Sequence, residues 1–119
     1  MSLPPEPPGV AEVPAPGPLR IDSRREGDAV VVALNGELDL ASAPELEREL
    51  REAEAANPAR VIIDLSGLGF MDSTGLQALL RTRERASSSA YELALRRGPH
   101  QVQRVFELTK TADAFSFED

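Results

Sequence analysis

Three consecutive side chains in the second half of the chain can hydrogen-bond: Asp72, Ser73 and Thr74, which are followed by Gly75. An apolar run ends just before them and an amphipathic pattern begins with them, so they stand at the start of a predicted helix. The simplest interpretation is that Asp72 or Ser73 caps this helix by accepting a hydrogen bond from a free amide. One cap is enough, however, and Gly75 is a poor helix former whose usual use is close approach by another group. The segment is therefore a candidate site for binding or modification.

A phosphate at this position is compatible with the predicted fold. The amide groups and the dipole of a helix N-terminus favour negative charge, so phosphorylated Ser73 would not disrupt the helix. The added charge, roughly −1.5 to −2, would lie beside Asp72 on an acidic surface. We expect such a modification to repel a binding partner rather than to unfold the chain.

A β-hairpin is predicted before this segment. Residues 19–22 and 29–34 are short and rich in aliphatic or β-branched side chains, and a polar turn with a glycine, residues 24–28, separates them. The pair Asn35-Gly36 is predicted to close the second strand.

A helix that runs to about Ala56 is predicted next. Ser42 stands three residues before Glu45, which is the pattern of a capping box. The leucines of this segment form an apolar stripe, while Glu47 and Arg51 are spaced to form an ion pair on its exposed side.

The remaining elements alternate between strands and helices. Residues 61–65 (VIIDL) form an almost continuous apolar run, typical of a central strand that is covered on both faces and joined through crossover helices. Gly67 and Gly69 are interpreted as loop glycines. The later patterns predict a helix from Ser73 to about Arg85, a strand at 91–95, a helix opening at Gly98-Pro99 and a short strand at 115–117. The order β-β-α-β-α-β-α-β indicates an α/β fold with a mixed sheet.

The composition indicates one soluble domain and argues against several classes of protein. The chain has 119 residues, a formal net charge of −7 and no cysteine, so thiolate metal sites and cysteine nucleophiles are excluded. The acidic balance and the scarcity of aromatic residues argue against direct binding of nucleic acid. No apolar run approaches the roughly 20 residues that span a bilayer, and no signal-peptide pattern is present. We expect a cytoplasmic protein without a membrane span.

The N-terminal segment differs from the rest of the chain. Residues 1–18 hold seven of the ten prolines and offer little apolar surface to offset the entropy of ordering. They are predicted to form a flexible proline-rich tail, and residues 19–119 are predicted to form the folded domain.

Two motifs at this separation resemble those of the STAS domain, a family named for sulfate transporters and anti-sigma factor antagonists. The first is GELD at residues 36–39, before a capped helix, and the second is FMDSTGL at residues 70–76, after an apolar strand. The resemblance covers about residues 19–117 and is strongest to the free-standing bacterial anti-sigma factor antagonists. It implies a STAS-like mixed sheet with helices.

The resemblance also implies a reversible switch. An unphosphorylated antagonist of this family binds an anti-sigma factor that is itself an ATP-dependent serine kinase, and so frees a sigma factor. The kinase phosphorylates the antagonist and ends the complex, and a metal-dependent serine phosphatase restores it. The antagonist is a substrate and not an enzyme, and neither a cofactor nor a metal site is implied for it.

The family's functional positions map onto single residues of this chain. Ser73 matches the phosphoacceptor because it directly follows the aspartate of the motif, and Thr74 is the lesser candidate. Asp39 matches an aspartate that lies near the phosphoacceptor at the partner surface. The predicted partner-binding set is completed by Asp72 and Gly75.

Two departures from the family pattern affect these expectations. Members usually continue into a C-terminal helix after the last strand, whereas this sequence stops at Asp119, so that helix is expected to be absent, truncated or replaced. The proline-rich start also differs from the compact start of typical members.

Two alternatives remain open from the sequence. The same motif is compatible with a constitutive STAS subunit of a transport or stress-signalling complex, in which the hydroxyl contacts a partner without being modified. A serine hydrolase would need a base and an orienting acid beside Ser73, but His100 is the only histidine and no Gly-x-Ser-x-Gly elbow is present. His100 is interpreted as a solvent-facing residue in the first turn of a helix.

Overall fold

Strands and helices alternate along residues 18–118, the part of the chain that the computed structural model describes. In chain order the elements are β1 (Arg20–Glu26), β2 (Ala29–Leu38), α2 (Ala43–Ala55), β3 (Arg60–Met71), α3 (Ser73–Ser87), β4 (Glu92–Arg96), α4 (His100–Leu108), the 3-10 helix η1 (Ala112–Ala114) and β5 (Phe117–Glu118). This confirms the predicted order of strands and helices, with η1 added before the last strand. The predicted flexible tail, except for its last residue, lies outside the described residues.

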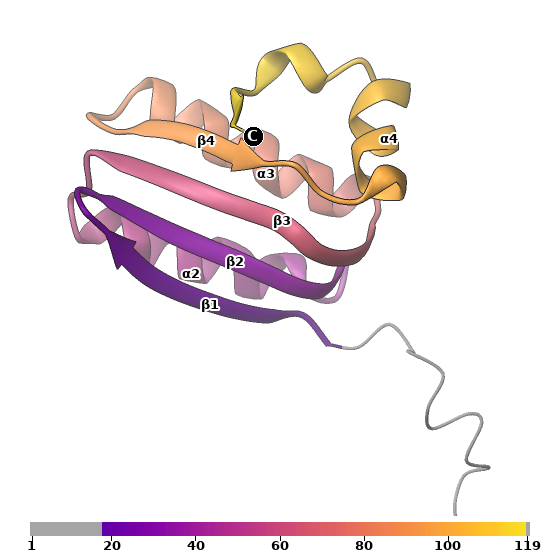
Figure 1. The fold of residues 1–119 in the computed structure, drawn as a ribbon, viewed down its shortest axis with the longest axis horizontal. Helices are drawn as coiled ribbons and strands as arrows, with labels where there is room; N and C mark the ends of the chain where they lie inside the picture. Colours follow the sequence, from indigo (N-terminus) through magenta and orange to yellow (C-terminus); the bar gives the residue numbers. More distant parts are fainter. Residues whose placement is uncertain (1–17, 119) are drawn as a thin grey trace, which may run out of the picture.

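The strands form one mixed sheet in the order β1-β2-β3-β4-β5 (Figure 1). β1 is antiparallel to β2, and each later pair of neighbours is parallel. Parallel neighbours cannot be joined by a tight turn, so α2, α3 and α4 serve as the crossover connections. The mixed sheet predicted from the sequence is therefore confirmed.

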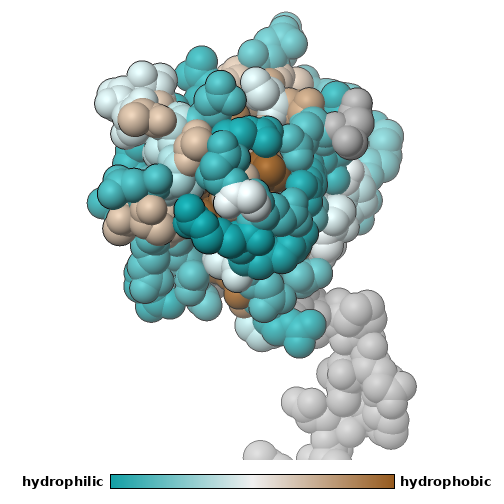
Figure 2. All heavy atoms as spheres, turned by 60° about the vertical axis from the view of Figure 1, so that its left-hand side comes forward, coloured by the Kyte–Doolittle hydropathy of each residue, from teal (hydrophilic) through white to brown (hydrophobic). Residues whose placement is uncertain are grey.

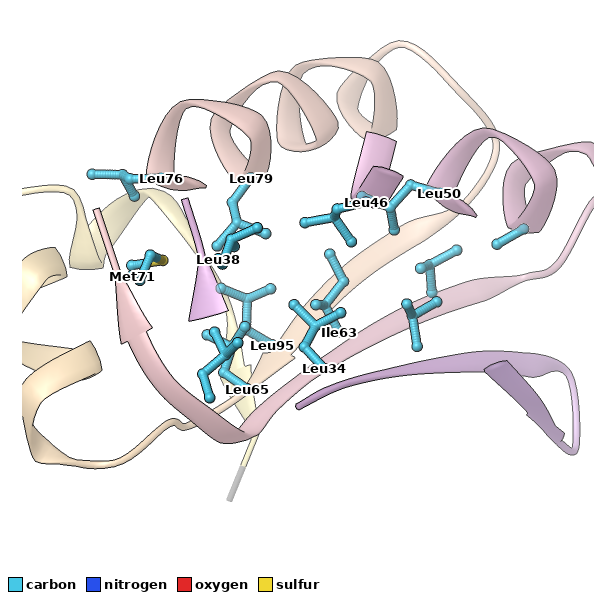
Figure 3. Packing of buried hydrophobic residues seen from close by; sticks show 14 of the residues in the cluster. Leu34, Leu38, Leu46, Leu50, Ile63, Leu65, Met71, Leu76, Leu79 and Leu95 are labelled. Atoms are coloured by element: carbon cyan, nitrogen blue, oxygen red, sulfur yellow. The ribbon is translucent and has the colours of Figure 1, made fainter. Parts of the chain in front are cut away.

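The main core lies between the sheet and its helices (Figure 3). The inward side chains of β2 and β3 pack beneath the leucine stripes of α2 and α3, and α4 adds two fully buried residues, Val102 and Phe106. Phe106 also makes edge-to-face ring contacts with Phe115 and Phe117, at centroid distances of 5.4 and 5.3 Å. These contacts fix the end of the described chain against α4.

The opposite face of the sheet carries no described helix, so the cover predicted for that face of β3 does not come from a helix. A small second cluster lies there, formed by Ala29, Val31, Ile62 and Ala94. The strand register places five charged side chains on the same face, and they form a chain of ion pairs across the sheet: Arg24–Glu26, Glu26–Arg96, Arg96–Glu118 and Glu118–Arg60. The aliphatic stems of these arginines can shield the small cluster while their charged ends stay in water.

The strands β1, β2 and β3 are longer than the sequence predicts, whereas β4 keeps the predicted length and β5 is shorter than predicted. β1 continues to Glu26, so the hairpin turn shrinks to two residues, and Gly27 takes a φ of +64° there. β2 does not close at Asn35-Gly36 but runs on to Leu38, and the glycines interpreted as loop residues lie inside β3. Two register shifts in the β2–β3 pairing, between Ala33 and Asn35 and at Gly36, accommodate this extension.

Gly67 shows why glycine is needed inside β3. A Cβ atom at this position would lie 2.7 Å from the carbonyl oxygen of Leu34 and would overlap the side chain of Asn35. Only a residue without a side chain lets β2 and β3 stay paired through the irregular stretch. The pairing therefore continues until Leu38 lies opposite Met71, directly before the two motifs.

Candidate functional site

The two sequence motifs meet where β2 and β3 end. Leu38 and Met71 are register partners, and the amide of Asp72 donates a hydrogen bond to the carbonyl oxygen of Leu38 at 3.1 Å. Asp39 and Asp72 therefore begin neighbouring loops at the carboxyl edge of two parallel strands. In open α/β sheets this edge is the usual place for binding sites.

Asp72 caps α3, as the simplest interpretation of the sequence predicts. Its side chain accepts a hydrogen bond from the amide of Gly75 at 2.9 Å, and its carbonyl oxygen accepts one from the amide of Leu76 at 3.0 Å. Because Asp72 does the capping, the hydroxyl of Ser73 is not needed for it. Ser73 is exposed and its hydroxyl makes no hydrogen bond to any other described residue, whereas Thr74 is half-buried.

Gly75 is buried, and the group that approaches it closely belongs to this chain. A Cβ atom at Gly75 would lie 2.6 Å from Cγ of Leu38 and 2.8 Å from its carbonyl oxygen. The first turn of α3 thus packs directly on the end of β2. Its role in partner binding stays a prediction, and its packing role is sufficient to explain the glycine.

The loop between β2 and α2 is closed by Asp39 and Ser42, and the predicted capping box does not form. The Ser42 side chain does not cap α2. Its hydroxyl donates a hydrogen bond to the carbonyl oxygen of Glu37 at 2.8 Å and accepts one from the amide of Asp39 at 3.0 Å. Oδ1 of Asp39 accepts hydrogen bonds from the amides of Ala41 at 3.0 Å and of Ser42 at 3.1 Å. Because the hydroxyl of Ser42 is engaged with the loop, it cannot reach the first turn of the helix.

The two loops carry acidic charge that is not balanced locally. Residues 36–45 and 69–77 contain Glu37, Asp39, Glu45 and Asp72 but no basic residue. None of these four carboxylates forms an ion pair with another described residue, whereas Glu26, Glu47, Glu54, Glu92 and Glu118 each have an arginine partner. We call these four residues together with Ser73 the acidic edge.

One predicted ion pair is replaced by a different one. Glu47 does not pair with Arg51 but with Arg81 of α3, through two contacts of 3.0 Å each. The hydrogen bond from Arg81 holds the pKa of the Glu47 carboxyl below its usual value. A pair between two helices was not visible from sequence, because the i to i+4 spacing describes one helix alone.

Other features of the described residues lie outside the acidic edge. A pocket of about 530 Å³ lies between α3 and the edge formed by β4 and β5, and no predicted site residue lines it. His100 is exposed at the start of α4 and is not hydrogen-bonded to Ser73. Within residues 18–118, no group of acidic or histidine side chains is arranged to hold a metal ion, and no helix has both the length and the apolar character of a membrane span.

Sequence reasoning did not find two exposed apolar residues near the acidic edge. Leu40 follows Asp39 directly and Phe70 stands two residues before Asp72, and both side chains are exposed. A leucine in a short loop is not distinctive in a sequence, because its exposure depends on the conformation of the loop.

Comparison with known proteins gives a consistent result. The family model described as STAS domain matches residues 20–119. The chain is 33% identical over 104 residues to the anti-sigma-F factor antagonist RsfB of Mycobacterium tuberculosis, and the match covers 86% of this chain and 85% of RsfB. It is also similar to the crystal structure of an anti-sigma factor antagonist from Mycobacterium paratuberculosis, with a TM-score of 0.75, 28% identity and 87% of each chain covered. The phosphorylated form of the Bacillus cell fate determinant SpoIIAA shares the fold, with a TM-score of 0.64 at 20% identity over 84% of this chain and 92% of SpoIIAA.

Proposed function

The chain belongs to the STAS domain family, and on this premise we propose that it is an anti-sigma factor antagonist controlled by phosphorylation of Ser73. In its unmodified form it binds an anti-sigma factor serine kinase and thereby frees a sigma factor. Phosphorylation of Ser73 ends this complex, and a serine phosphatase restores the active form. The observation that carries the proposal is the free, exposed hydroxyl of Ser73 on a helix start that Asp72 already caps.

The surroundings of Ser73 support it as the phosphoacceptor. A kinase must bring the hydroxyl in line with the γ-phosphate of its nucleotide, which requires an exposed side chain on a firmly placed segment. The cap by Asp72 and the packing of Gly75 on Leu38 hold the first turn of α3 in place. Thr74 is half-buried in the same turn and is the weaker candidate.

The chemistry of phosphoryl transfer explains why modification would end the complex. In the complex, Ser73 must lie against the nucleotide of the kinase. After transfer its phosphate, with a charge of roughly −1.5 to −2, faces both the remaining nucleoside diphosphate and the carboxylate of Asp72. Like charges in a partly desolvated contact repel each other, so the product leaves.

The chain acts in this proposal as a binding protein and a substrate, not as a catalyst. Neither His100 nor another base is hydrogen-bonded to Ser73 within residues 18–118, which favours a modified hydroxyl over a nucleophile. The acidic edge does not suit a phosphate backbone, so the effect on transcription passes through the protein partner. Because that partner regulates RNA polymerase, the proposal places the chain in the cytoplasm.

Asp39 has an indirect part in this function. Its carboxylate is engaged with the amides of Ala41 and Ser42 and gives the β2–α2 loop its conformation beside Asp72. We infer that Asp39 shapes the partner surface next to Ser73. Gly75 contributes by letting α3 approach β2.

Phosphotransfer from the cognate kinase tests the assignment of Ser73. Purified anti-sigma factor kinases of the source organism are incubated with ATP and the wild-type chain, Ser73→Ala or Thr74→Val, and intact mass is measured. We expect one phosphate on the wild type and on Thr74→Val, and none on Ser73→Ala. A single phosphate on Ser73→Ala that is lost in the double variant would move the site to Thr74. If no kinase modifies or binds the wild type, the constitutive-subunit alternative gains support.

A further inference from the structure

We propose that Leu40 is the apolar anchor of the partner surface, and that the partner covers it with an apolar pocket edged by arginine or lysine side chains. This inference rests on the proposed function, because it describes the chemistry of the surface that the anti-sigma factor would present. It adds a residue that neither motif includes.

Within the part of the chain that the structure describes, few large apolar side chains are exposed. Among residues 18–118 only Leu40, Phe70 and Leu108 combine a large apolar side chain with high exposure, at 73%, 44% and 69%. Leu40 and Phe70 flank the acidic edge, whereas Leu108 stands at the end of α4. Figure 2 shows the end of the molecule where β2 and β3 begin, and hydrophilic side chains predominate there. Two of the three exposed large apolar side chains among these residues thus lie at the ends of β2 and β3.

The loop that carries Leu40 is held in one conformation. The residues on both sides of Leu40 are fixed, because Asp39 accepts hydrogen bonds from the amides of Ala41 and Ser42 and donates its own amide to the Ser42 hydroxyl. Because the backbone is already fixed, binding through Leu40 does not have to order the loop, and this lowers the entropic cost of binding. A single exposed leucine is common on protein surfaces and does not by itself indicate a binding site. Leu40 differs because its loop is fixed by hydrogen bonds and follows the strand that pairs with the one before Ser73.

The charges around Leu40 identify the chemistry of the partner. The four carboxylates of the acidic edge lack ion-pair partners among the described residues, and no arginine or lysine stands within residues 36–45 or 69–77 to neutralise them. A surface of this kind gains most from a partner with basic side chains around the contact. Leu40 supplies apolar area at the centre, and Glu37 and Glu45 supply charge at the rim.

Phe70 extends the same surface onto the neighbouring strand. It is the register partner of Glu37 across the β2–β3 pair. The partner is therefore expected to contact the ends of both strands, with Leu40 in its pocket and Phe70 beside it. Leu40 and Ser73 belong to segments that are joined directly, because the Asp72 amide donates a hydrogen bond to the carbonyl oxygen of Leu38.

The chain offers a matched control for Leu40. Leu108 has the same side chain and nearly the same exposure, 69% against 73%, but lies on α4. The probe is the purified anti-sigma factor kinase of the source organism that binds the wild-type chain, with ADP and without ATP, so that no phosphate is transferred. We expect Leu40→Ala to raise the dissociation constant at least about tenfold and Leu108→Ala to change it less than about twofold. Thermal unfolding of both variants checks that the fold is unchanged.

A second pair of variants tests the basic rim. Glu45 lies in the first turn of α2 and Glu52 is exposed two turns further along the same helix. We expect Glu45→Gln to slow association at low salt more than Glu52→Gln, and we expect added NaCl to reduce the difference.

The possible results separate this inference from the proposed function. If the wild type binds no anti-sigma factor kinase, the proposed function fails and the inference falls with it. If the wild type binds but Leu40→Ala and Leu108→Ala bind equally well, only the inference is overturned. If Leu40→Ala weakens binding while Glu45→Gln and Glu52→Gln associate alike, Leu40 is supported as the anchor and the basic rim is rejected.

Discussion

Asp72 and Ser42 each stand one residue before a helix, but their side chains bind different groups. The carboxylate of Asp72 turns toward α3 and accepts the amide of Gly75, whereas the hydroxyl of Ser42 turns back to Glu37 and Asp39. The difference matters because a capped α3 leaves the Ser73 hydroxyl free. At the scale of single residues, the candidate site therefore depends on which neighbour does the capping.

Replacing Asp72 with alanine is expected to destabilise the fold through the start of α3. The Gly75 amide would lose its acceptor, which costs about 1 kcal/mol in the free energy of unfolding at a helix cap. Asp72→Asn keeps an acceptor oxygen and should lose less. Urea unfolding of the three proteins measures this, and equal stabilities would show that the hydrogen bond in the structure does not stabilise the helix.

Gly75→Ala tests the close packing of α3 on β2. Alanine favours a helix by up to about 1 kcal/mol over glycine, but the added methyl group would overlap Leu38, and overpacking of a core costs about 1–3 kcal/mol. We expect net destabilisation. Gly69→Ala is the control, because the nearest atom to its new methyl group would be 3.9 Å away. Stabilisation by Gly75→Ala would contradict the packing described above.

At the scale of elements, β2 and β3 are extended by four and six residues beyond their predicted ends, to Leu38 and Met71. The stretch of β3 around Gly67 lacks both apolar alternation and β-branched side chains, so its sequence looks like a loop. The role of Gly67 becomes clear only from the strand pairing, in which Gly67 lies opposite Asn35 next to a register shift and leaves room for the Asn35 side chain. Long periodic elements such as α3 were predictable, because their pattern repeats over several turns. The neighbourhood of Asp39 and Asp72 was expected only from the family resemblance.

A cluster at the other end of α2 and α3 gives a prediction for the single tyrosine. Tyr91 donates a hydrogen bond to Glu54 at 2.6 Å, and Arg85 pairs with the same carboxylate at 3.1 Å. Burial, followed by the interaction with Glu54, raises the pKa of Tyr91 well above its usual value. The unfolded chain would lose the phenol proton first, so this contribution to stability is present below about pH 10 and declines as the pH rises above it.

Spectrophotometric titration of the one tyrosine measures this effect directly. We expect little ionisation at pH 10 in the folded protein, and an earlier onset in Glu54→Gln, which lacks the negative charge. Ionisation of the wild type at the pKa of a free tyrosine, while the fold stays intact, would contradict the described cluster.

At the scale of the whole molecule, charge is distributed unevenly between the two faces of the sheet and its carboxyl edge. On the helix-free face, five charged side chains from four strands form ion pairs with one another, whereas the acidic edge forms none among the described residues. The sequence predicted the net charge and the mixed sheet, but not this distribution. An apolar run such as VIIDL indicates burial on both faces without showing whether helices or charged side chains provide the cover.

The paired carboxylates predict how stability depends on acid pH. Hydrogen bonds from arginine lower the pKa of Glu26, Glu47 and Glu118 in the folded chain below the usual value of 4.5. The unfolded chain therefore binds these protons first as the pH falls. Their contribution is present above about pH 4.5 and is lost as the pH falls through the lower values of the folded state. Chemical denaturation between pH 3 and pH 7 should show this decline, reduced by about 0.5 M salt, and a flat profile would contradict the ion pairs.

The most direct test of the central claim compares one purified chain before and after complete phosphorylation of Ser73. Its affinity for the anti-sigma factor kinase of the source organism is measured in both forms by calorimetry, with ADP present. We expect the phosphorylated form to bind at least about a hundredfold more weakly, which corresponds to about 3 kcal/mol, while its circular dichroism spectrum stays unchanged. Equal affinity of the two forms would contradict the switch and would favour a constitutive subunit.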